Sequence, residues 1–391
     1  MKVAVLGQYP LDLARLGGGV EAAIAYAHAE LAALPDLELH YYACHPSIAE
    51  PRRDAGPGGA VTWLPRGRLG RVTWHLAEVR ALVREVRALA PDLVHAHGTG
   101  LYAGAALASG LPAVITAHGI VAEEARLLTE RSARLRAALD AAYERWVVRR
   151  ARHLIVISPY VERVFGGQFR GRAWLVENPC DARFFAVTRA PRPGVILFAG
   201  SVIQRKGVLP LIRAFQRVHQ QMPAAELRIA GALTVEPEYA RACQEAARTL
   251  LPPRGDAVRF LGPLSRDALA AEYAGCALVV LPSFQETAPV AIEEAMAAGA
   301  PVVATRVGGI PWMIEDGVTG RTLPAPLTAA GDPEGLAALL LRTLHDPHAE
   351  ALGRRARQAA SERFCASVVA RRTWEVYRQV LGHGPAEPTC A

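Results

Sequence analysis

Short apolar runs alternate along the chain with longer segments in which apolar residues recur every three or four positions. The short runs predict buried strands, and the longer segments predict helices that cover them. The predicted strands are Lys2–Leu6, Leu37–Tyr42, Leu93–His97, Ala113–His118, Leu154–Ile157, Ala173–Val176, Val195–Ala199, Glu226–Ala230, Val258–Leu261, Ala277–Leu281 and Pro301–Ala304. The predicted helices are Val20–Leu34, Val72–Ala90, Glu123–Arg150 as one long or two broken helices, Val208–Gln221, Glu238–Thr249, Asp267–Ala274 and Val290–Ala298. This alternation is typical of parallel βαβ units.

The alternation breaks over residues 187–194, where two prolines and a glycine interrupt it. We interpret this segment as a linker between two doubly wound α/β domains, residues 1–187 and 188–366. The length of 391 residues agrees with two domains. In such sheets ligands bind beyond the carboxyl ends of the strands, so functional residues are expected in the loops that follow them.

Composition and charge exclude several classes of protein. Hydrophobic residues make up 51% of the chain and charged residues 21%, which excludes a mostly disordered chain. The net charge of +7 is spread over both halves, so no nucleic-acid partner is expected. The six cysteines form no CxxC pair and no Cys/His cluster with the spacing of a zinc site.

Two apolar stretches are not interpreted as targeting or membrane segments. The N-terminal run is shorter than the apolar region of a secretory signal. The uncharged stretch 98–117 is interrupted by glycines and Pro112, and it fits helix, turn and strand better than a membrane span. A cytoplasmic protein is therefore expected.

Three loops that follow predicted strands carry candidate binding residues. Gly18 and Gly19 lie in a glycine-rich loop that opens a helix, where backbone N–H groups can approach an anion; a merely flexible loop is the alternative. His118 ends a strand and precedes a glycine, although a lone histidine is more often structural. Arg205 and Lys206, the latter one of only two lysines in the chain, suit a diphosphate, with a solvated turn as the alternative.

Residues 281–297 form the most specific pattern. Glu286 follows a strand, Glu294 lies in the first turns of the next helix, and Glu293 is interpreted as solvated or structural. The N-terminus of that helix favours anions, and the residues there are Thr287, Ala288, Pro289 and Val290. Carboxylates beside an anion site fit neutral groups such as the hydroxyls of a sugar or a ribose.

The E-x7-E pattern of Glu286 and Glu294 resembles the signature of the retaining family 4 (group 1) glycosyltransferases. The matching segments are Pro282-Ser283, EAMAAGAPVVAT at 294–305, GGIP at 308–311, EDGVTG at 315–320, the Gly18–Glu21 loop, His118, and the altered PNGVD turn of Asn178-Pro179 and Asp181. Residues 362–377 resemble the closing helices of the family. The resemblance covers nearly the whole chain.

The resemblance implies a GT-B fold with two Rossmann-like domains, the donor in the second and the acceptor mostly in the first. Residues 367–391 are then a C-terminal helix and tail that pack back on the first domain. The resemblance also implies a UDP-, GDP- or ADP-linked sugar donor, retention of anomeric configuration, and no required metal or cofactor. The sequence contains no D-x-D, which agrees with the last point.

The resemblance also implies roles for individual residues. Lys206 neutralises the leaving diphosphate, assisted by the 287–290 amides, and Glu286 holds hydroxyls of the donor sugar. Glu294 binds the ribose, and His118 contacts the transferred sugar. Gly231, Leu261 and Gly262 lie near the base.

The chain departs from the family pattern at three positions. Ser201 replaces the arginine that follows Gly200 in the family, so Arg205 is the candidate for the second cation. Trp312 replaces the acid of GGIPE, and Pro179 alters the PNGVD turn.

Other functions stay open at this point. A catalytically inactive sugar-nucleotide or carbohydrate-binding protein of the same fold is one, with Ser201 as its support. A GT-B epimerase or phosphorylase is another. A dinucleotide oxidoreductase is a third, because residues 98–103 imitate G-x-G-x-x-A, but the next strand ends in His118 instead of an acid.

The acceptor is expected to be a carbohydrate, a lipid-linked molecule or a small molecule. Several arginines lie on or just before the helix predicted over Val72–Ala90, namely Arg66, Arg68, Arg71, Arg80, Arg84 and Arg87. They could contact an anionic membrane, and a plain solvated face is the alternative.

Overall fold

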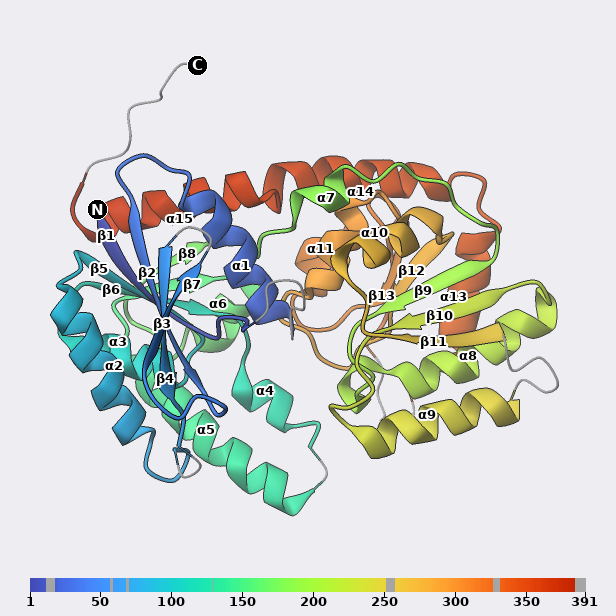
Figure 1. Ribbon diagram of the computed structural model, residues 1–391. Helices are drawn as coiled ribbons and strands as arrows, with labels where there is room; N and C mark the ends of the chain where they lie inside the picture. Colours follow the sequence, from blue (N-terminus) through green and yellow to red (C-terminus); the bar gives the residue numbers. More distant parts are fainter. Residues whose placement is uncertain are drawn as a thin grey trace. The chain divides into compact units, whose positions relative to one another are not determined.

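Two largely parallel β-sheets, each with its own helices, make up the computed structural model (Figure 1). It describes residues 1–11, 18–56, 59–67, 70–128, 130–250, 257–325 and 331–383. The chain divides into a first unit, residues 1–179 with 366–391, and a second unit, residues 180–365. The first unit is therefore assembled from two separate stretches of sequence.

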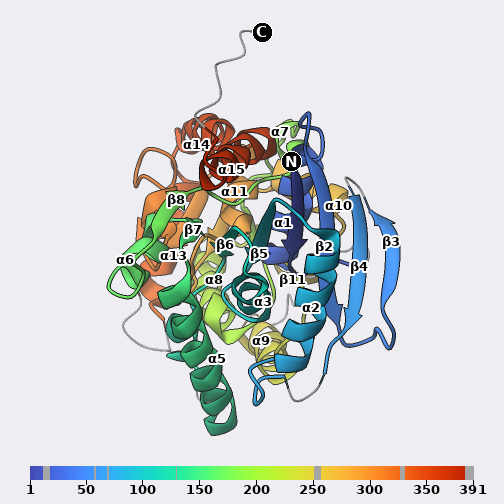
Figure 2. The ribbon, with the colours of Figure 1, turned by 90° about the vertical axis from the view of Figure 1, so that its left-hand side faces the viewer.

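The sheet of the first unit has the strand order β3-β4-β2-β1-β5-β6-β7-β8, and only the edge pair β3–β4 is antiparallel. Its strands are β1 (Lys2–Leu6), β2 (Glu38–His45), β3 (Arg52–Gly56), β4 (Gly59–Pro65), β5 (Leu93–His97), β6 (Ala113–Ala117), β7 (His153–Val156) and β8 (Arg172–Leu175). Its helices are α1 (Gly19–Leu31), α2 (Leu76–Leu89), α3 (Leu101–Ser109), α4 (Val121–Ala125), α5 (Arg131–Arg150), α6 (Pro159–Phe165) and α15 (Ala366–Val380). Figure 2 shows α2, α3 and α5 on one face of this sheet and α1 and α15 on the other.

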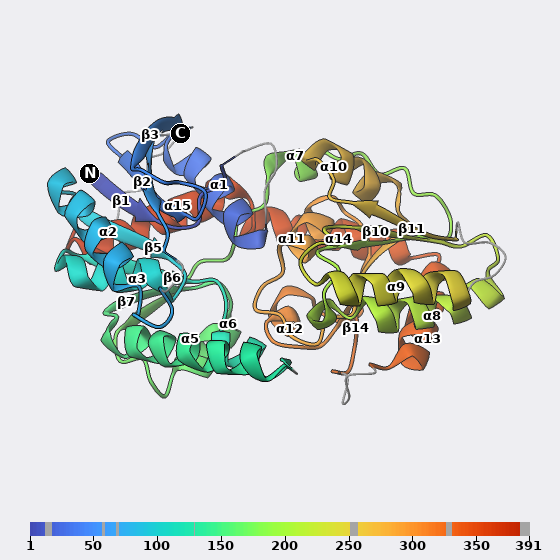
Figure 3. The same ribbon diagram turned by 60° about the horizontal axis from the view of Figure 1, so that its bottom comes forward.

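The sheet of the second unit is parallel throughout, with the order β11-β10-β9-β12-β13-β14. Its strands are β9 (Val195–Ala199), β10 (Glu226–Ala230), β11 (Val258–Gly262), β12 (Leu278–Leu281), β13 (Val302–Thr305) and β14 (Arg321–Leu323). Its helices are α7 (Ala182–Phe185), α8 (Val208–Gln221), α9 (Pro237–Leu250), α10 (Arg266–Gly275), α11 (Val290–Ala297), α12 (Ile310–Met313), α13 (Pro333–Leu344) and α14 (Ala349–Arg363), with a 3₁₀ turn at Gln204–Lys206. Figure 3 shows α8, α9 and α13 on one face and α10, α11 and α14 on the other.

Strand order reverses beside the first strand of each unit. In the first unit, β1 lies between β2 and β5, and in the second unit β9 lies between β10 and β12. These central strands are almost wholly buried, because their apolar runs face helices on both sides of the sheet. The loops that follow them are therefore the positions where a doubly wound sheet binds ligands.

The boundary between the units differs from the predicted linker, since it lies at 179/180 and not at 187/188. Residues 187–194 belong to the second unit. The N–H groups of Ala190 and Arg192 donate to the carbonyls of Ala274 and Gly275, and the Arg189 side chain donates to the carboxylate of Glu350. The prolines and glycine of this segment thus turn the chain within the second unit.

One predicted helix begins later in the structure, three strands are additions, and the other local predictions hold. Helix α2 begins at Leu76 instead of Val72, because Trp74 and His75 adopt positive φ angles of 50° and 57°, which a helix cannot include. The helical region 123–150 is two helices, α4 and α5. The strands β3, β4 and β14 are additions, and the stretch 98–117 contains α3 and β6. No helix in the described ranges is both long and apolar enough to span a membrane.

Candidate functional site

A buried carboxylate with two cations marks the loop after β12. Glu286 is 4% exposed. Lys206 Nζ donates to its Oε1 at 2.6 Å, and Arg205 Nη1 donates to its Oε2 at 3.2 Å. Ser283 Oγ also donates to Oε1, at 2.7 Å. Both basic residues of the 205–206 turn therefore point at one acid, and Ser283 is a site residue that the sequence analysis did not single out.

The charges around Glu286 decide its protonation. Burial by itself raises the pKa of a carboxyl, but the positive charges of Lys206 and Arg205 and the hydrogen bonds from Lys206 and Ser283 outweigh it. The pKa of Glu286 is consequently lowered, and the side chain is an anion at neutral pH. Lys206 and Arg205 reach this anion from the turn after β9, whereas Glu286 lies in the loop after β12.

Close contacts between backbones hold this loop in place. The N–H of Gly309 donates to the carbonyl of Glu286 at 3.0 Å, and that of Phe284 donates to the carbonyl of Arg205 at 2.8 Å. Gly308 has φ 52°, and a Cβ there would lie 1.7 Å from the Glu286 carbonyl oxygen. Only glycine fits this approach, which explains the GGIP run in structural terms.

Two glycines that the sequence analysis expects near the base lie together. The N–H of Gly231 donates to the carbonyl of Gly262 at 2.8 Å, and a Cβ on Gly231 would lie 1.9 Å from the carbonyl oxygen of Gly200. Ser201 directly follows Gly200, and Leu261 and Gly262 are the last two residues of β11. The loops after β9, β10 and β11 thus meet at one edge of the sheet, where the sequence analysis expects the nucleotide.

Glu294 lies in the second turn of α11, one of the helices beside β12, and is 8% exposed. The hydroxyl of Tyr273 donates to its Oε2 at 3.0 Å. Burial raises the pKa of Glu294 to about 8, and the negative charge of Asp181 acts in the same direction. The carboxyl of Glu294 is therefore largely protonated near neutral pH.

The residues just before this helix lie where the sequence analysis places them. They are Thr287, Ala288, Pro289 and Val290, with Pro289 as the N-cap of α11.

Glu293 requires a correction. Its side chain is fully buried, so the interpretation as a solvated residue is wrong, and the structural interpretation remains. Because every residue of α11 from Ile292 to Ala297 is buried, this helix packs between other elements and presents no polar face to water.

The raised pKa of Glu294 predicts a pH-dependent stability. An unfolded glutamate has a pKa of about 4.3, below the folded value, so between these values the unfolded state binds fewer protons. The free energy of unfolding should therefore fall as the pH rises from about 5 to 8, and this contribution should level off above the folded pKa. Glu294→Gln should lose this slope. Urea denaturation of both proteins across that range measures it, and parallel curves would show that Glu294 titrates normally.

In the first unit, the glycine-rich loop lies at the start of α1. Gly18 is the N-cap and Gly19 the first residue of the helix, while Gly17 lies outside the described residues. A Cβ on Gly18 would meet no atom within 4 Å. Neither packing nor a left-handed backbone requires glycine at position 18. The residue therefore serves to leave open space beside the backbone.

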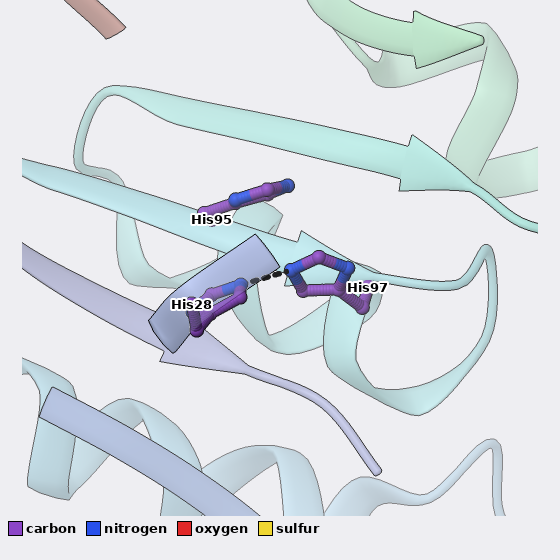
Figure 4. Close-up of side chains that lie close together, drawn as sticks. All are labelled: His28, His95 and His97. Carbon is purple, nitrogen blue, oxygen red and sulfur yellow. Dashed lines mark hydrogen bonds between the residues drawn. The ribbon is translucent and has the colours of Figure 1, made fainter. Parts of the chain in front are cut away.

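His118 follows β6 and joins a group of buried histidines. Its Nδ1 lies 3.2 Å from Oδ1 of Asn178, and its Nε2 lies 2.8 Å from Nδ1 of His97. His97 Nε2 in turn lies 3.1 Å from His28 Nε2 (Figure 4). The sequence analysis missed His28 and His97. The alternation of His95 and His97 at the end of a strand beside the strand of His118 is the signal that could have found them.

The arginines on α2 are partly engaged within the first unit. Arg87 donates to the carbonyl of Ser109, and Arg84 pairs with Glu85. Arg68 lies outside the described residues. These contacts favour the solvated-face interpretation, and membrane contact stays a prediction.

Comparisons with known proteins cover both units. Residues 17–184 match Glycosyltransferase Family 4, and residues 193–346 match Glycosyl transferases group 1. A glycogen synthase of Mycobacterium tuberculosis is 31% identical over 330 residues, which are 78% of this chain and 75% of that protein.

Solved structures share the fold. A sucrose-phosphate synthase from Thermosynechococcus elongatus has a TM-score of 0.83 at 21% identity, covering 98% of this chain and 100% of the other. HepE of Anabaena in complex with UDP-glucose has a TM-score of 0.72 at 21% identity, covering 97% and 100%.

Both units match glycosyltransferase families, and these matches do not support the oxidoreductase interpretation of residues 98–103. Sequence family, relatives and fold agree with the residue pattern around Glu286 and Glu294. The chain belongs to the group 1, family 4 glycosyltransferases and has their GT-B fold.

Proposed function

We propose that this protein transfers a sugar from a nucleotide-sugar to an acceptor with retention of the anomeric configuration and without a required metal. The observation that carries the proposal is the buried anion of Glu286, held by Lys206 and Arg205. A donor supplies both kinds of partner that this cluster can use. Its diphosphate is an anion for the two cations, and its sugar hydroxyls are donors for the carboxylate.

The cluster suits exchange with a substrate. Buried ion pairs carry a large desolvation cost, so their contribution to stability is small and a better-matched ligand can replace them. When the diphosphate takes Lys206, the oxygen Oε1 of Glu286 becomes available to a sugar hydroxyl. Binding thus rearranges existing partners and leaves no buried charge without one.

The chemistry requires a bond to break between the anomeric carbon and the diphosphate oxygen, which keeps the electron pair. The acceptor hydroxyl oxygen forms a new bond to the same face of that carbon, and its proton leaves with the diphosphate or to solvent. Negative charge grows on the diphosphate and positive charge on the sugar ring. Lys206 and the N–H groups of Thr287, Ala288 and Val290 stabilise the first, and the anion of Glu286 faces the second.

The remaining roles follow the same division. Glu294 accepts from or donates to the ribose hydroxyls, while Gly231, Leu261 and Gly262 approach the base. Gly18 and Gly19 leave room beside the phosphates, and His118 contacts the transferred sugar. The positive charge of Lys206 and Arg205 takes the part that a divalent cation plays in metal-dependent transferases.

The donor class has further support from relatives. HepE of Anabaena, which shares the fold, has been solved in complex with UDP-glucose, and this motivates a nucleotide-sugar as the donor class. We leave the base open among UDP, GDP and ADP. The names of the relatives point to different acceptors, as in glycogen synthase and D-inositol 3-phosphate glycosyltransferase. We therefore keep a sugar, a lipid-linked molecule and a small molecule as candidate acceptors.

A panel of nucleotide-sugars tests the proposal. We expect one donor to raise the unfolding free energy by about 2.7 kcal/mol at 100 times its dissociation constant, and to release its sugar slowly to water. Both effects should persist in EDTA, and proton NMR should show product with the donor's anomeric configuration. Full loss in EDTA with recovery in Mn²⁺ or Mg²⁺ would contradict the metal-free mechanism. Stabilisation without any sugar release would favour the inactive binding protein.

A further inference from the structure

We propose that His97 is a positioning residue: within a chain of hydrogen bonds from His28 to Asn178, it holds the ring and the tautomer of His118. The chain is His28–His97–His118–Asn178, with distances of 3.1, 2.8 and 3.2 Å. The part of this hydrogen-bond chain in the reaction rests on the proposed function, in which His118 contacts the sugar. The tautomers of the histidines do not depend on that function.

The four residues come from separate elements of the first unit. His28 lies on α1, His97 ends β5, His118 follows β6, and Asn178 follows β8. The adjacent parallel strands β5 and β6 bring His97 beside Thr116, two residues before His118. His28 and His97 are 1% and 6% exposed, so water does not compete for the hydrogen bond between them.

Burial keeps the three rings neutral. It lowers the pKa of His28 to about 3 and that of His118 to about 4, and it lowers the pKa of His97 well below its ordinary value. Repulsion by neighbouring histidines adds to the effect at His28 and His97. Each neutral ring carries one N–H and one bare nitrogen, so each can donate once and accept once.

These constraints fix the direction of every bond. Oδ1 of Asn178 can only accept, so Nδ1 of His118 carries the proton and Nε2 is bare. Nδ1 of His97 must then donate to His118, which leaves Nε2 of His97 to accept from Nε2 of His28. His28 ends the chain with a bare Nδ1, which has no hydrogen-bond partner in the described part of the protein.

The nearby ring of His95 stands outside this chain. Its centroid lies only 4.1 Å from that of His97, but its nitrogens lie 2.6 Å from the Tyr377 hydroxyl and 2.7 Å from Thr116 Oγ1. His28, His95 and His97 have nitrogens within 4.8 Å of one another, a spacing that could suit a metal ion (Figure 4). Both nitrogens of His95 are already engaged, so hydrogen bonding explains the cluster without an ion.

The tautomer has a consequence for the sugar. Nε2 of His118 is saturated by His97, so the single ring N–H of His118 is at Nδ1. That N–H donates to Asn178 over 3.2 Å, the longest bond in the chain, and it is the bond that a substrate oxygen would share or replace. His118 is thereby set to donate to the sugar and not to accept from it.

NMR on the full chain with ¹⁵N-labelled histidine tests the tautomer without a substrate. Long-range proton–nitrogen correlations distinguish a protonated Nδ1 from a protonated Nε2. We expect the signal of His118, assigned by its loss in His118→Gln, to show a protonated Nδ1 at neutral pH. A protonated Nε2 on His118, or a mixture of both forms, would overturn the proposal whatever the enzyme's activity.

Three variants test the positioning role. His97→Leu removes the donor to His118 and should lower kcat by about 10- to 100-fold, since small misplacements of reacting groups have effects of that size. His97→Asn keeps an N–H donor near the position of Nδ1 and should recover most of that loss. His95→Leu is the matched control, an equally buried neighbour outside the chain, and should leave the His118 signal unchanged.

The outcomes separate the proposals. Equal effects of His97→Leu and His95→Leu on kcat and on the His118 signal would show a merely structural role. If the fixed tautomer of His118 is lost in His97→Leu but not in His95→Leu, and is recovered in His97→Asn, the positioning role is supported. If His97→Leu does not fold, the comparison of His97→Asn with His95→Asn replaces it. Absence of turnover with every donor would instead count against the proposed function.

Discussion

Lys206→Ala should lower kcat by about 10²- to 10³-fold, the effect of losing one donor from a preorganised anion site. Lys206 Nζ lies 2.6 Å from Glu286 Oε1, and its side chain is 13% exposed. In the proposed reaction this charge faces the diphosphate, where negative charge grows as the anomeric bond breaks. The loss should therefore appear in kcat with donor and acceptor both saturating.

Arg205→Ala is the matched control on the same turn. Arg205 Nη1 donates to the carbonyl of Gln285 at 2.8 Å as well as to Glu286, so part of its function is to hold the loop. We expect a smaller loss of kcat than in Lys206→Ala. A larger loss in Arg205→Ala would show that Arg205, with Ser201 at the family's arginine position, has become the main cation of the site.

Glu286→Gln should lower kcat by about 10²-fold, as expected when a preorganised charge is removed from a site without changing its shape. Glutamine keeps the volume and one acceptor oxygen, but it no longer faces the positive charge that grows on the sugar ring. It also leaves Lys206 and Arg205 without their anion, so both bind the diphosphate more readily. We therefore expect donor affinity to be kept or raised while turnover falls.

Ser283→Ala gives the comparison for this experiment. Ser283 donates to the same oxygen at 2.7 Å, and its removal changes the hydrogen bonding of Glu286 without removing the charge. Its kcat should fall only a few-fold, about 1 kcal/mol of hydrogen-bond free energy. Initial rates and donor titration on both variants measure the contrast. A Glu286→Gln enzyme with kcat within threefold of the wild type would refute the role given to this carboxylate.

The sequence predicts the central strands well and misses β3, β4 and β14, which lie toward one edge of each sheet. Lys2–Leu6, Leu93–His97 and Val195–Ala199 have the same bounds in the structure, because short and mainly apolar runs favour a strand buried on both faces. Strand β3 has the sequence RRDAG and lies at the edge of the sheet. Backbone hydrogen bonds to β4 hold β3 there, and a pattern of hydrophobic residues cannot predict such bonds.

The candidate site shows the same division. Glu286, Glu294 and the turn at 205–206 were readable because they lie in short motifs along the chain. The histidine chain was not, because His28, His97 and His118 are far apart in sequence and only the parallel register of β5 and β6 and the packing of α1 bring them together. Burial is also invisible in the pattern, as Glu293 illustrates.

The first unit is completed by a helix that is made after the whole second unit. Helix α15 packs on α1, and its Tyr377 and Val376 belong to the core of that unit. During synthesis all of residues 180–365 therefore leave the ribosome before α15 exists. Domains generally fold as units as they emerge, so the second unit can fold early, while residues 1–179 must wait with the α15-binding side of α1 uncovered. A segment that is translated after the second unit thus decides when the first unit becomes native.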